Sequence, residues 1–210
     1  MSEVILYDYW RSSASYRVRI ALNLAGVSHI SVPVDLLKKD HKSTTHLQRN
    51  PQGLVPALLI DGHLLTQSLT IIDYISETRA IRFLPTRAID RAKTLAIAHA
   101  IAMDIHPVCN LSVVANVMAI TAGGDEVRSA WMNKFIGEGL ATVEMLLHKT
   151  PGPFCFGESI TVADICLIPQ VYNAMRWGID MGIFERINSI TKRLEVNPAF
   201  AAAHPDKVRP

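Results

Sequence analysis

The sequence predicts a mixed α/β region followed by an all-helical region. Short β-type runs alternate with helical patterns over the first eighty residues, whereas strand signals nearly vanish after Ala88 and long helical patterns replace them. The segment 77–88 between the two regions contains Pro85 and three arginines, which is typical of a linker. With 210 residues, 49% of them apolar, the chain can bury a sizeable core. We therefore predict two domains, over residues 1–84 and 85–210.

The first region is expected to open with a strand, a helix and a second strand. Residues 4–9 and 29–34 are rich in β-branched and aromatic side chains and predict the two strands. Between them, apolar residues recur at helical spacing over 18–25, and Gly26 follows as a typical helix end. These residues predict one amphipathic helix between two strands.

A hairpin and a further helix are expected next. Residues 55–61 and 63–67 read as strands joined by the Asp61–Gly62 turn, and Asp-Gly is a strong two-residue hairpin signal. A helix is predicted from Ser68 to about Thr78. The expected order of the first region is β-α-β-α-β-β-α.

The second region is expected to contain long helices only. Thr161 followed by Asp164 has the spacing of a capping box, so we expect a helix to start there for reasons of stability. The predicted helices cover about 88–119, 126–148, 161–176 and 186–196.

Composition excludes several classes of function. The net charge is only +2 and the cations are scattered, so nucleic acid is not expected as a partner. The N-terminus lacks a signal-peptide pattern and no apolar run approaches the ~18 residues of a membrane span, so we expect a cytoplasmic protein with no membrane partner. Cys109, Cys155 and Cys166 show no C-x-x-C spacing, and no metal is expected. Because they fall in helical or apolar surroundings, the cysteines are interpreted as small buried residues.

Ser12 and Ser13 lie where the first helix is predicted to begin. One interpretation is that one of them caps the helix. The other is that the exposed hydroxyls and free N–H groups bind an anion, and both can hold together. Ser68, behind Thr66 and Gln67, begins another helix of the same domain. Two such sites would suit a small ligand with a carboxylate at one end and a thiolate or phosphate at the other.

Val55–Pro56 stands at the start of a predicted strand, where proline cannot donate to the ladder. An ordinary edge strand or turn explains this dipeptide. A cis bond is the alternative, and it would turn the backbone groups of Val55 outward to pair with an extended, peptide-like ligand. The sequence leaves both open.

Several segments together resemble the zeta class of glutathione transferases. They are SSASYRVRIAL, NPQGLVPALLIDG, TQSLTIIDYI, NLSVV and TVADICLIPQVYNAMRW, in order and over nearly the whole chain. The first block is specific to the class, whereas the Val-Pro and Gln-Ser signatures are common to many glutathione transferases. The resemblance implies a thioredoxin-like N-terminal domain that binds glutathione and an all-α C-terminal domain that closes the pocket for an acidic substrate.

The resemblance also implies roles for individual residues. Ser12, with Ser13 beside it, resembles the hydroxyl that activates the glutathione sulfur. The best-known motif reads Ser-Ser-Cys, and this chain has Ala14 instead, so the reactive thiol is expected to be that of glutathione. The complete implied set of glutathione-binding residues is Ser12, Ser13, Ala14, Arg17, His41, Val55, Gln67, Ser68, His106, Asn110, Leu111 and Ser112.

Arginines are the expected partners of the substrate carboxylates. Arg176 resembles the substrate-binding arginine of the class, and its planar fork suits a carboxylate. Arg11 is a second candidate, at the mouth of the pocket. Arg17 and Arg19 are two positions apart and are expected to point to different faces of the helix, so either has an alternative structural role.

The activity implied by the resemblance is glutathione-dependent cis–trans isomerisation of maleylacetoacetate in tyrosine, phenylalanine or homogentisate breakdown. Isomerisation of maleylpyruvate is the nearest alternative, and the related enzymes have arginines where this chain has Leu111 and Ser112, which favours maleylacetoacetate. Glutathione transfer to small α-halo acids and a non-catalytic glutathione-binding module are further alternatives. The resemblance also implies a homodimer.

Overall fold

The computed structural model describes residues 3–210, which divide into two compact units. Unit 1 contains the residues up to Phe83 together with Glu195–Pro210, and unit 2 contains Leu84–Leu194. Residues 195–210 thus pack with unit 1, although they were predicted to belong to the helical domain. The assignment of glutathione binding to residues 1–84 and of substrate binding to residues 85–210 stays a prediction.

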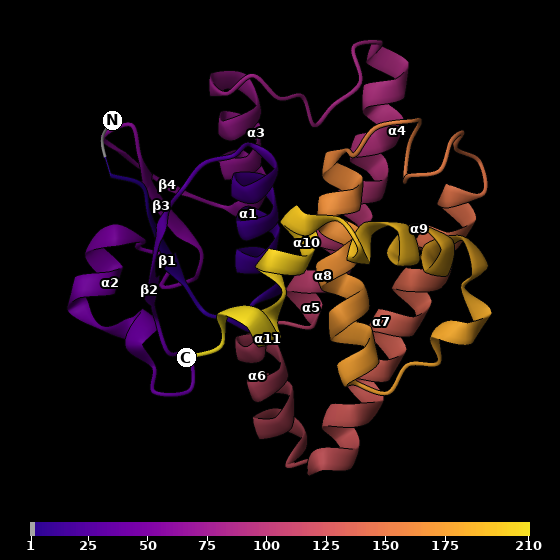
Figure 1. Cartoon of the computed structure of the whole chain (residues 1–210). Coiled ribbons are helices and arrows are strands. Elements are labelled where there is room, and N and C mark those ends of the chain that lie inside the picture. The colour runs from indigo at the N-terminus through magenta and orange to yellow at the C-terminus, as the bar shows by residue number, and fades with distance from the viewer. Residues whose placement is uncertain (1–2) are drawn as a thin grey trace. The chain divides into compact units, whose positions relative to one another are not determined.

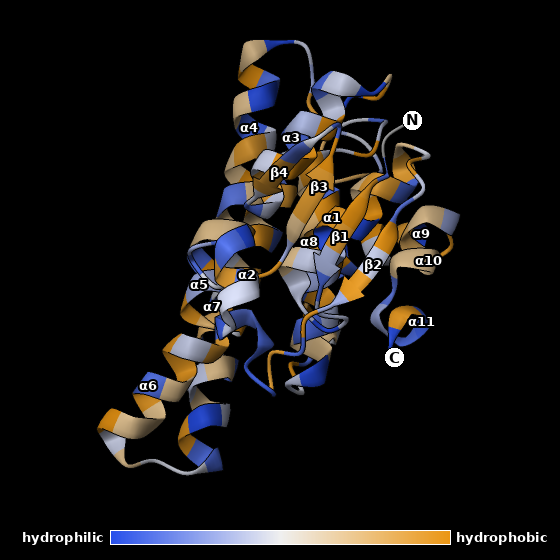
Figure 2. Ribbon diagram, turned by 90° about the vertical axis from the view of Figure 1, so that its left-hand side faces the viewer, coloured by the Kyte–Doolittle hydropathy of each residue, from blue (hydrophilic) through white to orange (hydrophobic). Residues whose placement is uncertain are grey.

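Unit 1 is built on a four-stranded mixed sheet with the strand order β2-β1-β3-β4. Strands β1 (Ile5–Asp8) and β2 (Ile30–Pro33) are parallel, whereas β3 (Ala57–Ile60) and β4 (His63–Thr66) continue the sheet in antiparallel pairs. All four strands fall inside the predicted segments. Figure 2 shows that the inner strand β3 is coloured as apolar along its length.

The hairpin turn follows from its two residues. Asp61 has φ +53° and Gly62 has φ +81°, so both adopt the left-handed conformation that a two-residue hairpin of this kind requires. Glycine adopts it without steric cost, and aspartate tolerates it better than most residues. The Asp-Gly prediction is confirmed.

Helices lie on both faces of the sheet of unit 1. Figure 1 shows α1 (Ser13–Leu24) and α3 (Ser68–Thr78) on one side and α2 (Thr44–Arg49) on the other. The short η1 (Asp40–Lys42) precedes α2, and the chain ends in α10 (Pro198–Ala203) and α11 (Pro205–Val208). Helix α1 packs against both α3 and α10. The mixed sheet with this helical cover has the expected thioredoxin-like form.

Unit 2 contains helices and no strand in the part of the chain that is described. Three long helices agree with the predicted ranges, namely α7 (Asp125–Leu147), α8 (Val162–Arg176) and α9 (Glu185–Glu195), the last of which ends at the unit boundary. A 3-10 turn, η3 (Met181–Ile183), lies between α8 and α9.

The single helix predicted over 88–119 is wrong. Helix α4 (Ala88–His99) continues through a π-helical stretch, η2 (Ala100–Ile105), into α5 (His106–Val108), and there the helix ends. A new helix, α6 (Leu111–Thr121), begins after Asn110, whose side chain accepts a hydrogen bond from the Ser112 N–H. Asparagine competes for backbone donors in this way and favours a cap over a helix interior.

The segment Ala88–Thr121 is the one stretch of residues 3–210 long and apolar enough to pass a test for a membrane span. Only 28% of its most apolar window is buried. Core helices of other proteins pass the same test, so length and composition give weak evidence here.

The start of α8 shows the predicted capping box. The Asp164 carboxylate accepts the backbone N–H groups of Cys155 and Thr161 and the hydroxyl of Thr161, each at 2.8 Å. Its side chain is fully buried, and burial raises the pKa of Asp164 above its usual value. One carboxylate thus joins the loop before α8 to the helix N-terminus.

Replacing Asp164 by alanine is expected to destabilise the protein by about 3 kcal/mol, because three buried donors lose their acceptor. Urea unfolding of purified protein measures the change. Asp180→Ala is the matched control, since exposed Asp180 caps a single N–H group, that of Gly182, and its loss is expected to cost under about 1 kcal/mol. Equal losses in the two variants would contradict this account of Asp164.

Candidate functional site

The hydroxyl of Ser12 caps α1 and keeps a proton to donate. Ser12 Oγ accepts the N–H of Ser15 at 3.3 Å, and the N–H of Ser12 donates to the Tyr9 carbonyl at 2.9 Å. The Ser12 carbonyl accepts the N–H of Tyr16 at 2.8 Å, and the hydroxyl makes no further hydrogen bond within residues 3–210. The capping and anion-binding interpretations are therefore compatible, because the oxygen accepts from the helix while the O–H remains available.

The N-terminus of α1 is an electropositive position. Its first turn, which includes buried Ser13 and half-buried Ala14, contains no acidic residue, so no carboxylate offsets the partial positive charge of this end of the helix. A thiolate or carboxylate placed at this end would be stabilised by about 0.3–1 kcal/mol from the dipole alone.

A second such terminus lies beside the first in unit 1. Helix α3 begins at buried Ser68, again without an acidic residue in its first turn and without a side-chain cap. Arg17, in the adjacent α1, donates to Ser68 Oγ at 3.4 Å. Gln67, just before the helix, has φ +68° and donates from Nε2 to Gln52 Oε1 at 2.8 Å. Arg17 and Ser68 are thus in contact, and the assignment of Arg17, Gln67 and Ser68 to one binding site stays a prediction.

The peptide bond between Val55 and Pro56 is cis. Of the two interpretations that the sequence leaves open, the structure therefore has the cis bond. This is the interpretation in which the backbone groups of Val55 are expected to turn outward. Neither the N–H nor the carbonyl of half-buried Val55 is hydrogen-bonded within residues 3–210. These groups present a donor and an acceptor of the kind that pairs with an extended backbone.

Two residues that hold this loop were not predicted from the sequence, namely His46 in α2 and Asn50, the C-cap residue of that helix. Buried His46 and Asn50 both bond to the carbonyl of Leu54, at 2.9 Å from Nε2 and from Nδ2. Since a carbonyl only accepts, the proton of the imidazole is on Nε2. One side chain from α2 and one from its C-cap residue thus fix the residue that precedes Val55. Asn50 lies in the NPQG run that carries the resemblance, whereas His46 has no such signal.

His41, in η1, is close to the same region of unit 1. Its Nδ1 is buried and has no hydrogen-bond partner in the described part of the chain. Burial, with a contribution from the charge of Lys42, lowers the pKa of His41 below its usual value. A shielded ring nitrogen without a partner is costly, so a polar ligand that bonds to it would offset part of this cost.

The loop before Ser12 contains two arginine contacts with aromatic rings. Arg11 donates to the Tyr9 hydroxyl at 3.3 Å, and its guanidinium carbon lies 5.1 Å from the centre of the Trp10 ring. Arg209, near the C-terminus, lies at the same distance from this ring. Arg11 thus lies inside the turn that ends at Ser12, and its role as a cation at the mouth of the pocket stays a prediction.

The remaining predicted site residues belong to unit 2. His106 begins α5 and is half-buried, whereas Arg176 is exposed at the end of α8, with its guanidinium carbon 5.8 Å from the centre of the Tyr172 ring. Asn110 caps α6 and accepts both the N–H and the hydroxyl of Ser112, at 3.0 and 3.1 Å, and Leu111 is exposed. The observed contacts of Asn110 and Ser112 are those of a helix cap, and a role for this second set in ligand binding stays a prediction.

None of the three cysteines resembles a nucleophile. Cys155 and Cys166 are fully buried, and burial raises the pKa of Cys155 well above its usual value. Cys109 is half-buried, and desolvation raises its pKa to about 11. It lies at the break after α5, outside the helix that the sequence predicts around it. No cluster of three or more His, Cys, Asp or Glu residues that could hold a metal ion occurs in the region that the structure describes.

The chain matches two sequence families. Residues 2–77 match "Glutathione S-transferase, N-terminal domain" and residues 113–202 match "Glutathione S-transferase, C-terminal domain". Among curated proteins, it is 57% identical to the maleylacetoacetate isomerase of Rhizobium meliloti (strain 1021), covering 100% of this chain and 99% of that protein. It is 41% identical to the maleylacetoacetate isomerase of Mus musculus, covering 96% and 92%.

Solved structures show the same relationship. A holo structure of maleylpyruvate isomerase, described as a bacterial glutathione S-transferase in the zeta class, has a TM-score of 0.94 at 33% identity and covers 98% of both chains. A maleylacetoacetate isomerase from Methylobacterium extorquens AM1 with bound malonate and glutathione has a TM-score of 0.93 at 36% identity and covers 97% of both chains. The chain therefore belongs to the glutathione S-transferase family, and within it to the zeta class.

Proposed function

We propose that this chain is a glutathione-dependent cis–trans isomerase of maleylacetoacetate. The observation that carries the proposal is the Ser12 hydroxyl at the N-terminus of α1, which caps the helix and retains an O–H to donate to a thiolate. The similarity to the Rhizobium meliloti isomerase over the full chain supports the choice of reaction.

The residues of unit 1 fit glutathione. We place its sulfur at Ser12, with Ser13 and Ala14 beside it, and its cysteinyl backbone at the unpaired N–H and carbonyl of Val55. Gln67 and Ser68, at the second helix N-terminus, are proposed to hold the γ-glutamyl carboxylate, with Arg17 as their neighbour. The unpartnered Nδ1 of His41 offers a further polar contact.

When bound, glutathione supplies a thiolate that adds to the conjugated carbon of the cis enone diacid and is expelled after rotation about the former double bond. The task of the protein is to favour the thiolate over the thiol. A charge-assisted hydrogen bond from Ser12 is worth about 1.5–3 kcal/mol and the helix N-terminus about 0.3–1 kcal/mol. At about 1.4 kcal/mol per pKa unit, the two together lower the thiol pKa by about one to three units, of which the hydrogen bond supplies about one to two.

The protein's own thiols do not compete for this role. With a pKa of about 11, Cys109 carries a thiolate in about one molecule in ten thousand at pH 7, and Cys155 and Cys166 are out of contact with solvent. Ala14 in place of the cysteine of the best-known motif is therefore compatible with activity, because the reaction requires one thiol and the cofactor provides it.

Maleylpyruvate is the second candidate substrate, and the structural likeness to a maleylpyruvate isomerase favours it. Against it, this chain has apolar Leu111 and neutral Ser112 at the start of α6, so these positions supply no cation for a second carboxylate. A homodimer, a cytoplasmic location and the absence of membrane and nucleic-acid partners stay predictions. Transfer of glutathione to α-halo acids is a side activity that the same thiolate would support.

Turnover of both acids with and without glutathione tests the proposal. We expect isomerisation of maleylacetoacetate only when glutathione is present, and slower isomerisation of maleylpyruvate, followed by the change in ultraviolet absorbance of the substrate. Equal or faster turnover of maleylpyruvate would reverse the choice of substrate. Full activity without glutathione, or no activity with it, would refute the enzyme proposed here.

Replacing Ser12 by glycine is expected to lower kcat by about 10- to 100-fold, because the thiol pKa rises by one to two units when the donor is lost. Glycine is itself an acceptable helix cap, so the free energy of unfolding should fall by only a few tenths of a kcal/mol. Ser12→Thr is the matched control, since it keeps both the cap and the hydroxyl, and it should retain most of the activity. A fully active Ser12→Gly variant would exclude a role for this hydroxyl.

Replacing Arg176 by alanine is expected to raise the KM for maleylacetoacetate about 10-fold or more, because a substrate carboxylate loses a bidentate partner. Arg176→Lys should lie between the two, since lysine keeps the charge without the planar fork. Steady-state kinetics with saturating glutathione measure both. The KM for glutathione should stay unchanged, and an increase confined to it would place Arg176 at the cofactor instead.

A further inference from the structure

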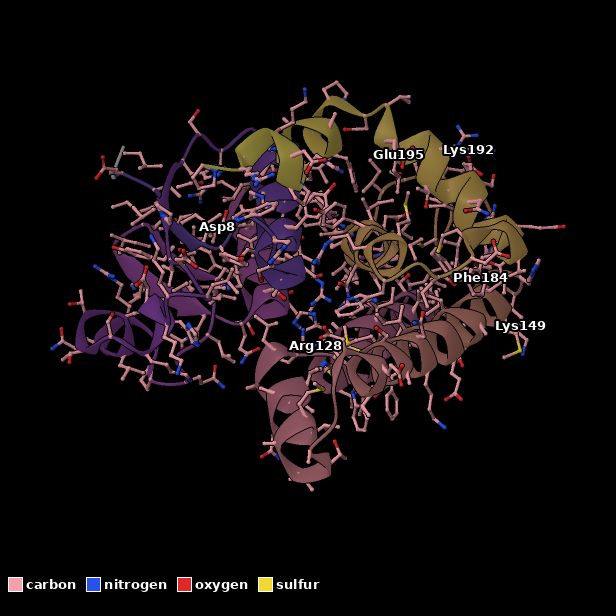
Figure 3. The ribbon with its side chains drawn as sticks, turned by 90° about the horizontal axis from the view of Figure 1, so that it is seen from below. Asp8, Arg128, Lys149, Phe184, Lys192 and Glu195 are labelled. Atoms are coloured by element: carbon pink, nitrogen blue, oxygen red, sulfur yellow. The ribbon has the colours of Figure 1, made fainter. Side chains whose placement is uncertain are left out.

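Arg19 is one of the most deeply buried side chains of unit 1, with 1% of its surface exposed. Its guanidinium bonds in three directions. Nη1 donates to both oxygens of Asp8, at 2.9 and 2.7 Å, Nη2 donates to the Trp10 carbonyl at 2.9 Å, and Nε donates to the Ala203 carbonyl at 3.0 Å. Asp8, labelled in Figure 3, lies at the end of β1.

Stability alone does not explain a buried ion pair of this kind. The desolvation cost of the two charges offsets much of their attraction, and well-packed apolar residues often stabilise a core as well or better. The bonds to backbone carbonyls are what an apolar pair would not reproduce. Of these carbonyls, that of Trp10 lies inside the turn that leads to the active-site helix.

The turn from Tyr9 to Ser12 is closed by the bond between the Ser12 N–H and the Tyr9 carbonyl. Trp10 is an internal residue of this turn, and its carbonyl points to the Arg19 guanidinium. Ser12, the last residue of the turn, caps α1 through Ser15. Arg19 therefore bonds to the turn at one point and belongs to α1 itself, so it joins the helix to the loop that enters it.

We propose that Arg19 is a positioning residue for the Ser12 turn: by bonding the Trp10 carbonyl while Asp8 and Ala203 fix its guanidinium, it sets where the Ser12 hydroxyl lies relative to the N-terminus of α1. This inference rests on the proposed function and adds to it a residue that does not touch the thiol. Lysine at this position would keep the charge opposite Asp8 but would not reach all three acceptors, because it lacks the rigid fork.

The test compares the pH dependence of kcat/KM, with glutathione present, for the wild type and for Arg19→Lys. A displaced hydroxyl stabilises the thiolate less, which raises the thiol pKa, so the midpoint should move up by about one pH unit and activity at pH 7 should fall about tenfold. The variant should approach wild-type activity at high pH. Asn23→Ala is the matched control, since Asn23 donates from α1 to the Ala199 carbonyl without touching the turn, and its midpoint should equal that of the wild type.

If Arg19→Lys does not fold, the double variant Asp8→Asn/Arg19→Gln removes both charges of the pair, so no buried charge is left without a partner. The same upward shift in the midpoint of the pH profile is expected for this variant. A wild-type midpoint in either folded Arg19 variant, whatever its stability, would overturn the proposal. Failure of the proposed function is distinguishable, because it would appear in the wild type as turnover without glutathione or in Ser12→Gly as full activity.

Discussion

The electropositive N-terminus of α1, with Ser12 as its cap, is the feature on which the proposed chemistry depends. A hydroxyl there can accept from Ser15 and donate outward at the same time, so structural and chemical roles do not compete for it. The absence of an acidic residue from the first turn keeps the terminus attractive to an anion. An aspartate cap would satisfy the helix equally well and would repel a thiolate.

The loops around this terminus are fixed by buried polar side chains that bond to single carbonyls. Arg19 holds the carbonyl of Trp10, and His46 with Asn50 holds that of Leu54. Loop backbone that must present unpaired groups to a ligand cannot be held by those groups, so other residues have to restrain it. In both cases the restrained carbonyl lies one or two residues before the group that is proposed to bind glutathione.

The distance along the sequence between two interacting residues decides whether their interaction could be predicted. The Asp61–Gly62 turn and the capping box of Thr161 and Asp164 depend on residues at most three apart, and both were predictable from local chemistry. The break at Asn110 was missed because apolar helical periodicity on both sides conceals a cap. The bond from Arg19 to the Ala203 carbonyl spans 184 residues, and the packing of residues 195–210 in unit 1 follows from contacts of that range, which no local pattern records.

A cofactor thiol suits isomerisation better than a cysteine of the chain. The nucleophile must add and then leave within one turnover, which requires a thiolate that is stabilised enough to exist at neutral pH but is still a good nucleophile. The protein can meet this condition by placing the Ser12 hydroxyl and the N-terminus of α1 next to the thiol of glutathione. The protein's own cysteines are poor nucleophiles by comparison. Desolvation raises the pKa of Cys109, the one cysteine of the three with partial exposure, to about 11. Its thiol therefore stays protonated at neutral pH and does not react with the unsaturated acid.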